Sequence, residues 1–211
     1  MNNLILITSV INTPKTPLSY TKVRSIYSAQ ERYEQTLKTI ESCSKIPNNE
    51  ILFIETSHLR EDRENNIKSL VDHYYNFIGN LAVSELTEGI SAKTRGESTQ
   101  IWEGLKQIDV EKYENIIKIS GRYWFSEDFD FSNYDNNNNI FKEGPNRQLA
   151  TVMYKINKNS FSIFKEAVIY CKENNTMLER NYGKFFFDKH ETLPKIGVEG
   201  YVSVDGNYVR W

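Results

Sequence analysis

Short apolar runs alternate with segments of helical periodicity through the first half of this chain. The runs are of strand length and cover residues 4–11, 51–54, 81–86 and 115–119. Strands that alternate with helices form a parallel sheet that helices cover on both faces, with right-handed crossovers. The sequence therefore predicts a three-layer α/β protein with a mostly parallel central sheet.

Three helices are predicted between these strands. Ser28 and Glu31 form a capping-box pattern at the start of the first helix, which is broken at Pro47. The second helix covers residues 61–78, and the third covers about residues 91–108. Each has apolar residues at helical spacing, as expected of helices that pack on a sheet.

The second half of the chain is less regular. Residues 135–139 are a polar run that we expect to form an exposed loop or turn. A strand is predicted over residues 148–156, followed by helices over residues 160–172 and 176–190. Glycines in the tail, around residues 197–206, predict a short strand or hairpin close to the site.

Size, charge and cysteine use narrow the class of protein. No linker divides the 211 residues, so we expect one domain over residues 1–211. The formal net charge of −2 does not favour a nucleic acid or an anionic membrane as partner. We find no signal peptide and no apolar run long enough to span a membrane. Cys43 and Cys171 predict buried thiols, which fits a cytoplasmic protein, in the host cytoplasm if the source is a virus.

The end of the fourth predicted strand is the strongest candidate for a binding site. This strand stops at Ser120-Gly121, and Arg122 and Tyr123 follow at once. In open α/β sheets, ligands bind beyond the carboxyl ends of the strands, and a guanidinium there can bind a diphosphate. The chain has no G-x-G-x-x-G in its first βα turn and no G-x-x-x-x-G-K-[ST], so neither a standard dinucleotide site nor a P-loop is expected.

Several motifs resemble those of nucleotide-sugar glycosyltransferases of the GT-A fold. More closely, they resemble a group of bacterial, phage and large-virus proteins described as glycosyltransferase-like. The motifs are Arg24-Ser25-Ile26-Tyr27, Glu31-Arg32, Gln35-Thr36-Leu37, Ile54-Glu55, Lys93 with Gly96-Glu97, Lys118-Ile119-Ser120-Gly121-Arg122-Tyr123, Gly197-Val198-Glu199-Gly200 and Val204-Asp205-Gly206. The resemblance spans most of the chain. It implies a GT-A-like fold in which residues 1–124 bind the nucleotide and residues 125–211 form the acceptor side.

The resemblance also implies transfer of a sugar from a nucleotide-diphosphate sugar to a hydroxyl of a glycan or glycoconjugate acceptor. The residues expected to bind the donor are Arg24, Tyr27, Glu55, Lys93, Gly121, Arg122 and Tyr123. Lys93 and Arg122 are expected at the diphosphate, and Arg122 is also expected to stabilise the leaving group. Glu179 is the expected catalytic base. The alternatives are a structural ion pair for Arg122, a solvated side chain for Lys93, and a capping box with Thr176 for Glu179.

One departure from the GT-A pattern concerns the metal. Typical members have an Asp-x-Asp after the fourth strand, which holds manganese or magnesium under the diphosphate, whereas this chain has Gly121-Arg122-Tyr123. Either Arg122 takes the place of the metal, or the protein is a catalytically inactive module that binds a nucleotide or glycan. Asp128 and Asp130 form an Asp-x-Asp further along, where alternating phenylalanines predict a packed edge with exposed acids. The alternative is a metal site formed by Asp128 and Asp130 with Asp188 or His190. We assign no metal ligands and leave the dependence on manganese or magnesium open.

Overall fold

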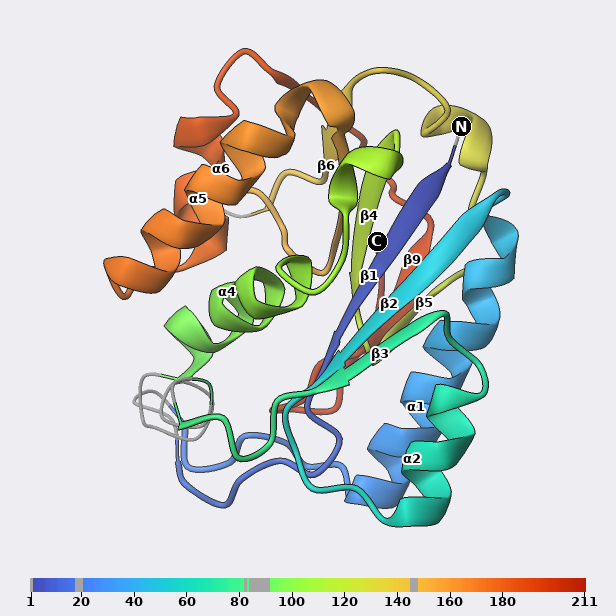
Figure 1. Ribbon diagram of the computed structural model, residues 1–211, viewed down its shortest axis with the longest axis vertical. Coiled ribbons are helices and arrows are strands. Elements are labelled where there is room, and N and C mark those ends of the chain that lie inside the picture. The colour runs from blue at the N-terminus through green and yellow to red at the C-terminus, as the bar shows by residue number, and fades with distance from the viewer. Residues whose placement is uncertain (1, 18–20, 82, 84–91, 145–147) are drawn as a thin grey trace.

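The computed structural model describes residues 2–17, 21–81, 83, 92–144 and 148–211, and the side chains of all of these except residues 92–95. Its central sheet contains β1 (Asn3–Ser9), β2 (Asn49–Glu55), β3 (His73–Asn76), β4 (Asn115–Ser120), β6 (Asn139–Phe141), β7 (Met153–Asn157) and β8 (His190–Thr192). The strand order is β3-β2-β1-β4-β7-β6-β8 (Figure 1).

The first four strands of this sheet are parallel to one another. The chain passes from β1 to β2 to β3 on one side, and then returns to place β4 on the other side of β1. β7 is antiparallel to β4 and to β6, and β8 runs parallel to β6. The predicted α/β fold with a mostly parallel central sheet is confirmed.

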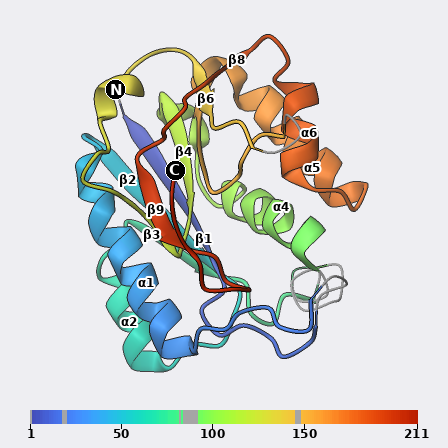
Figure 2. The ribbon, with the colours of Figure 1, turned by 180° about the vertical axis from the view of Figure 1, so that it is seen from behind.

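Helices cover both faces of the sheet. α1 (Ala29–Ser42) and α2 (Glu61–Lys68) lie on one face, and α4 (Ala92–Leu105), α5 (Phe161–Glu173) and α6 (Leu178–Phe185) lie on the other (Figures 1 and 2). Side chains of a strand alternate between the two faces, so β1 contributes to two cores.

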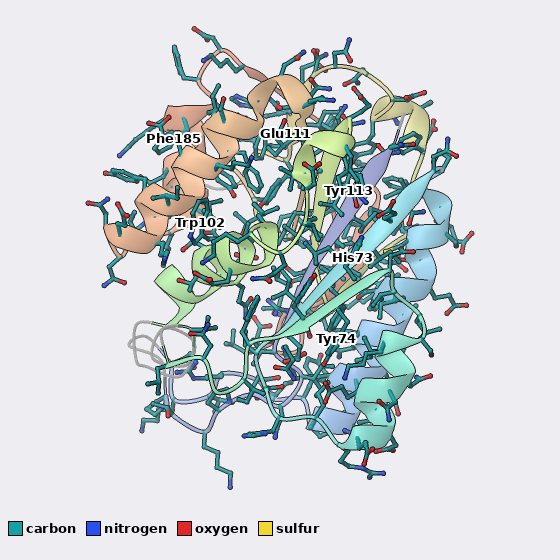
Figure 3. All side chains as sticks on the ribbon, viewed as in Figure 1. His73, Tyr74, Trp102, Glu111, Tyr113 and Phe185 are labelled. Atoms are coloured by element: carbon teal, nitrogen blue, oxygen red, sulfur yellow. The ribbon has the colours of Figure 1, made fainter. Side chains whose placement is uncertain are left out.

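The two cores follow from this alternation. Leu4 and Leu6 belong to the core under α4, α5 and α6, and Ile5 and Ile7 belong to the core under α1 and α2. Trp102 of α4 and Phe185 of α6, both labelled in Figure 3, pack against the first of these cores. No helix in the described parts of the chain is both long and apolar enough to cross a membrane.

A small antiparallel sheet is added beside α1. It contains β5 (Tyr123–Phe125), β9 (Val198–Tyr201) and β10 (Tyr208–Arg210), in the order β10-β9-β5. β9 and β10 form the hairpin predicted in the tail, and β5 packs on α1. Because β5 follows β4 after only two residues, this sheet lies next to the end of β4.

Several predicted elements are confirmed at nearly the predicted positions. They include the first, second and fourth strands, and the helices predicted at residues 91–108 and 160–172. The capping box is also confirmed, because Glu31 N donates to Ser28 Oγ at 3.2 Å and Ser28 N donates to Glu31 Oε2 at 2.8 Å. The two cysteines are free and buried, as predicted.

The helix predicted over residues 61–78 was wrong beyond Lys68. The chain turns there, and His73–Asn76 forms β3 at the edge of the sheet beside β2. The backbone N–H of Ile51 donates to Asp72 Oδ2 at 2.8 Å, which fixes the start of this strand. The strand predicted over residues 81–86 was also misplaced: Leu81 and Val83 are helical, and the rest of that segment lies outside the described residues.

Two elements of the second half are shorter than predicted. The helix predicted over residues 176–190 ends at Phe185, and residues 190–192 form β8. Asp188 has a positive φ of 56°, a backbone conformation that a helix does not contain. The strand predicted over residues 148–156 is regular only from Met153, with an isolated bridge between Leu149 and Glu143 before it.

Candidate functional site

A cavity of about 410 Å³ lies at the carboxyl ends of β1 and β4. Thr8 and Ser9 at the end of β1, and residues 120–122 at the end of β4, form its base. The order of the sheet reverses between these two strands, since β2 and β3 lie on one side of β1 and β4 on the other. Open α/β sheets bind ligands at such a reversal. The cavity is therefore where the sequence predicted a site.

Both halves of the chain form the walls. Arg24, Arg32 and residues 96–97 come from the first half, together with the ends of β1 and β4. Residues 148–152, Glu179 and residues 202–204 come from the second half. Of the predicted site residues, the structure brings together Arg24, Gly121, Arg122, Tyr123 and Glu179.

Arg122 lines the cavity with a side chain that is only partly exposed. Its Nε is buried and donates no hydrogen bond to any residue that the structure describes, and its guanidinium carbon lies 5.2 Å from the centroid of the Tyr123 ring. Among the described residues, no ion pair includes this guanidinium. The structural ion pair considered for Arg122 is therefore not formed, and its charge remains available to a ligand.

The backbone that carries Arg122 is held on two sides. Gly121 N donates to the carbonyl of Thr8 at 2.9 Å, and Thr36 Oγ1 of α1 donates to the carbonyl of Gly121 at 2.8 Å. A Cβ at Gly121 would lie 3.1 Å from Ser9 Cβ, so glycine allows the close approach of the two strand ends. The position of Arg122 is thus fixed by β1 and by α1.

Arg32 of α1 is a second guanidinium on the cavity wall, and only 7% of its surface is exposed. It donates to the carbonyl of Val10 at 2.9 Å and to Ser203 Oγ at 2.9 Å. Burial first, and then the nearby charge of Arg122, lower the pKa of Arg32 to about 9. The group is still a cation at neutral pH.

Glu179, in the first turn of α6, also lines the cavity. Thr151 Oγ1 donates to Glu179 Oε1 at 2.8 Å, which orients the carboxylate. The capping box considered for Glu179 is not formed, because Met177 is the N-cap residue and makes no side-chain cap bond. The structure is therefore compatible with a base at this position, and Thr151 is its immediate partner.

A buried ion pair lies on the cavity wall between α4 and β4. Lys118 is fully buried in β4, and its Nζ donates to Glu97 Oε1 of α4, to Ser120 Oγ at 2.8 Å and to the carbonyl of Thr151 at 2.7 Å. A buried lysine needs partners of this kind, because an unpaired charge inside a protein is costly. The negative charge of Glu97 is therefore compensated within the protein.

Arg24 and Tyr27 were both expected at the nucleoside, but they take different positions. Arg24 lines the cavity, and its Nε donates to the carbonyl of Thr16. Tyr27 is not among the lining residues; its Oη donates to the carbonyl of Gly206 at 3.0 Å, and its ring packs against Tyr201. Tyr27 therefore connects the segment before α1 to the tail of the chain.

Glu55 does not reach the cavity, contrary to the expectation of a nucleoside contact. Its side chain is fully buried, and Oε1 accepts from the backbone N–H groups of Ile11, Thr56 and Ser57 and from Ser57 Oγ. Burial raises the pKa of this carboxyl group. The role of Glu55 is thus to hold together the segments that follow β1 and β2.

Lys93 lies in the first turn of α4, but its side chain is outside the described residues. Its contact with a donor phosphate stays a prediction. Gly96 and Glu97, one turn further along the same helix, do line the cavity.

The Asp-x-Asp at Asp128 and Asp130 lies elsewhere, at a second cavity of about 240 Å³. Asp128 pairs with Arg210 at 2.9 Å, and Asp130 accepts from the backbone N–H of Ser132 at 2.9 Å. Within the described part of the chain, no three histidine, cysteine, aspartate or glutamate side chains are grouped as metal ligands. The residues present do not form the carboxylate site that typical GT-A proteins use for a divalent ion.

Two residues on the cavity wall or next to it, Arg32 and Lys118, were not predicted as site residues. Arg32, Gln35, Thr36 and Thr39 recur at helical spacing, so α1 carries a polar stripe that proves to be buried. This stripe faces the end of β4 and the cavity, and its spacing was a usable signal. Lys118 interrupts a run of isoleucines in a buried strand, and such a lysine predicts a buried partner.

No protein-family model and no curated protein matches this sequence. Solved structures do match it. A protein of Desulfovibrio desulfuricans G20 that is assigned as a nucleotide-diphospho-sugar transferase has a TM-score of 0.51 and 8% identity, over 92% of this chain and 80% of its own. A glycosyltransferase involved in the glycosylation of the major capsid of PBCV-1 has a TM-score of 0.50 and 12% identity, over 92% and 81%.

A third match is the apo form of the glycosyltransferase GlyE of Streptococcus pneumoniae TIGR4, with a TM-score of 0.51 and 8% identity. It covers 92% of this chain, which spans 45% of the GlyE chain. At these identities the likeness shows the fold alone. The chain has the α/β fold that these nucleotide-diphospho-sugar transferases and glycosyltransferases share.

Proposed function

We propose that this protein is a glycosyltransferase that moves a sugar from a nucleotide-diphosphate sugar to a hydroxyl of a glycan or glycoconjugate acceptor. One observation carries the proposal: Arg122 and Glu179 line the same cavity, at the reversal point of the sheet. A cation for a diphosphate and a carboxylate for a hydroxyl are the two groups that such a reaction needs. The fold shared with glycosyltransferases supports the same conclusion.

In this reaction Glu179 acts on the acceptor and Arg122 acts on the donor. The oxygen of the acceptor hydroxyl attacks the anomeric carbon of the donor, and its proton passes to the Glu179 carboxylate. The bond between that carbon and the diphosphate oxygen breaks, and its electron pair leaves with the nucleoside diphosphate. The positive charge of Arg122 stabilises the negative charge that develops on this leaving group.

The division of labour along the chain follows the same pattern. Residues 1–124 supply Arg24, Gly121, Arg122 and Tyr123, which we assign to the donor. Residues 125–211 supply Glu179 and the wall formed by residues 148–152, which we assign to the acceptor. The buried free thiols of Cys43 and Cys171 fit a reducing compartment, and we propose the cytoplasm as the place of action.

The proposal is tested with purified protein and a panel of nucleotide sugars, with and without manganese. Thermal unfolding reports binding, because a ligand that binds only the folded state raises the unfolding temperature. Release of nucleoside diphosphate from the same donors reports turnover. A stabilising donor that is also consumed supports the proposal. Binding without turnover of any donor favours the inactive nucleotide-binding or glycan-binding module, and no stabilisation by any nucleotide sugar contradicts both.

A further inference from the structure

The guanidinium groups of Arg32 and Arg122 line the same cavity, and neither forms an ion pair with a carboxylate in the described parts of the chain. Arg32 donates to neutral oxygens: the carbonyl of Val10 and the hydroxyl groups of Ser25 and Ser203. Arg122 has a buried Nε–H that finds no acceptor among the described residues. A buried donor without a partner is unfavourable, so this arrangement suggests that an acceptor is supplied from outside the chain.

The two positive charges influence each other. The charge of Arg122 contributes, after burial, to the lowered pKa of Arg32, so the groups are close enough to repel each other. Both are cations at neutral pH. An anion that enters between them removes this repulsion and accepts hydrogen bonds from guanidinium donors, which are suited to phosphate oxygens.

In the described parts of the chain, neither carboxylate that lines the cavity forms an ion pair with these guanidiniums. Glu97 accepts from the ammonium group of the buried Lys118, and Glu179 accepts from Thr151. The pair of guanidiniums thus keeps a charge of about +2, and the diphosphate of a nucleotide sugar carries one negative charge on each phosphate. The charges of the site and of the diphosphate match without a further cation.

The same place in typical GT-A proteins holds a divalent ion, and the residues of this chain do not fit one. Gly121 and Arg122 occupy the position after β4, where a carboxylate ligand is required. An arginine at that position repels a metal ion, and the nearest carboxylate of α4 already neutralises Lys118. The guanidinium pair and a divalent ion are therefore alternatives at this site.

We propose, on the basis of the function proposed above, that Arg32 and Arg122 together bind the donor diphosphate without a divalent metal ion. Arg122 alone was predicted from the sequence, and Arg32 is the new member of the site. Hydrogen bonds to the carbonyl of Val10 and to Ser203 Oγ hold the Arg32 side chain in place before binding. The side chain therefore loses little conformational freedom when the anion binds.

Calorimetric titration of the full chain with UDP, GDP, ADP and TDP tests this proposal. Each titration is done once in EDTA and once in manganese chloride. We expect the nucleoside diphosphate that binds to have the same Kd in the two buffers, within a factor of about three. The Arg122→Gln variant is expected to lose affinity in EDTA by about 10–100-fold, because a charged hydrogen-bonding partner of the diphosphate is removed.

Arg60→Gln is the matched control. Arg60 pairs with Asp62 on the surface and is 71% exposed, so its loss should change neither the Kd nor the unfolding temperature. Unfolding of unliganded Arg122→Gln is expected to match that of the parent chain, which separates a lost contact from a lost fold. Arg32→Lys, which keeps the charge but loses the fixed geometry, should weaken binding by about tenfold.

The outcomes separate this inference from the proposed function. Binding that requires manganese, or that manganese strengthens more than tenfold, overturns the metal-free site and leaves the glycosyltransferase proposal standing. Unchanged affinity in Arg122→Gln also overturns the inference. If no nucleoside diphosphate binds in either buffer and no nucleotide sugar stabilises the protein, both proposals fail together.

Discussion

The two ends of the central sheet differ in how completely their buried polar groups are hydrogen-bonded. At the amino end of β1 and β4, four buried asparagines hydrogen-bond across the sheet. Asn115 Nδ2 donates to Asn3 Oδ1 at 2.9 Å, Asn157 Nδ2 donates to Asn115 Oδ1 at 3.3 Å, and Asn157 N donates to Asn139 Oδ1 at 2.9 Å. At the other end, Arg122 has a buried donor that finds no acceptor in the described part of the chain.

Charges show the same contrast. At the amino end, Glu50 Oε2 accepts from Lys112 Nζ at 2.9 Å and from Tyr113 Oη at 2.6 Å, and it lies 2.9 Å from His73 Nε2. His73 and Tyr113 are labelled in Figure 3. At the carboxyl end, Arg32 donates hydrogen bonds to neutral oxygens, and neither Arg32 nor Arg122 forms an ion pair within the described residues. Completed networks stabilise a fold, whereas uncompensated charges indicate a ligand.

The largest effect, on the rate of the proposed sugar transfer, is expected from removing the charge of Glu179 in the cavity. Glu179→Gln should lower the rate of sugar transfer by about 10²–10⁴-fold, because the acceptor hydroxyl loses its base. The affinity for the nucleoside diphosphate should change by less than about twofold, since the diphosphate is assigned to Arg122 and not to Glu179. Single-turnover kinetics and calorimetry measure the two quantities. Glu173→Gln, on the exposed end of α5, is the control, and an equal rate in both variants would contradict the role of Glu179.

The next effect concerns the backbone of β9 and β5, next to the cavity at the carboxyl end of the sheet. A Cβ at Gly200 of β9 would lie 2.5 Å from the carbonyl oxygen of Arg122, so β9 and β5 must separate to admit it. Gly200→Ala should lower the free energy of unfolding by about 3 kcal/mol. Gly121→Ala, where the closest contact is 3.1 Å, should cost less. Urea unfolding of both variants decides the order, and a Gly200→Ala protein as stable as the parent would show that β9 and β5 are not so closely paired.

The asparagine network at the amino end of β1 and β4 should be sensitive to a single apolar substitution. Asn115→Leu removes the hydrogen bond to the buried Asn3 Oδ1 and leaves Asn157 Nδ2 with only its longer contact to the carbonyl of Glu114, at 3.5 Å. We expect a loss of about 2 kcal/mol in the free energy of unfolding, the cost of buried polar groups without hydrogen bonds. Asn65→Leu, on the exposed side of α2, should change stability by less than about 0.5 kcal/mol. An equal loss in the free energy of unfolding for the two variants would show that the network does not stabilise the fold.

The smallest effect concerns Glu50 and depends on pH. Hydrogen bonds from Tyr113, His73 and Lys112 lower the pKa of Glu50 from 4.5 to about 2. A carboxyl group whose pKa is lowered by folding stabilises the folded state above its unfolded pKa, and this contribution is lost as the pH falls toward about 2. Because 40% of the side chain is exposed, solvent screening reduces the effect to about 1 kcal/mol at pH 7.

Glu50→Gln should therefore lower stability at pH 7 and make little difference near pH 2. Urea unfolding at several pH values between 7 and 2 measures the difference between the variant and the parent chain. A difference that stays constant over this range would show that the ionised carboxylate is not what stabilises this end of the sheet.

Much of the fold could be predicted because its central strands carry local signals. β1 and β2 contain continuous apolar runs, β4 contains one that only Lys118 interrupts, and Ser28 and Glu31 mark the start of α1. β3 could not be recognised in this way. Leu70, Tyr74 and Phe77 continue the helical spacing of the preceding residues, and only pairing with β2 makes residues 73–76 a strand.

The site could be predicted in part for a related reason. Arg122 follows a strand directly, so its position beyond the sheet follows from the order of elements along the chain. Arg32 and Thr151 come from segments that reach the cavity only through tertiary packing. Glu55 shows the reverse error: it also ends a strand, but the turn after β2 folds back over its carboxylate and buries it.

The hairpin of β9 and β10 has a consequence for how this molecule is made. The backbone of Ser203 accepts from Ile26 N at 2.8 Å and its hydroxyl accepts from Arg32, so the wall that holds Arg32 is completed by a residue 171 positions further along the chain. A nascent chain that has emerged only as far as Tyr123 has no β9 to pair with β5 and no Ser203 to fix Arg32. Residues 1–124 therefore do not complete this wall by themselves, and the proposed binding of a nucleotide should appear only after Ser203 has been synthesised and β9 has paired with β5.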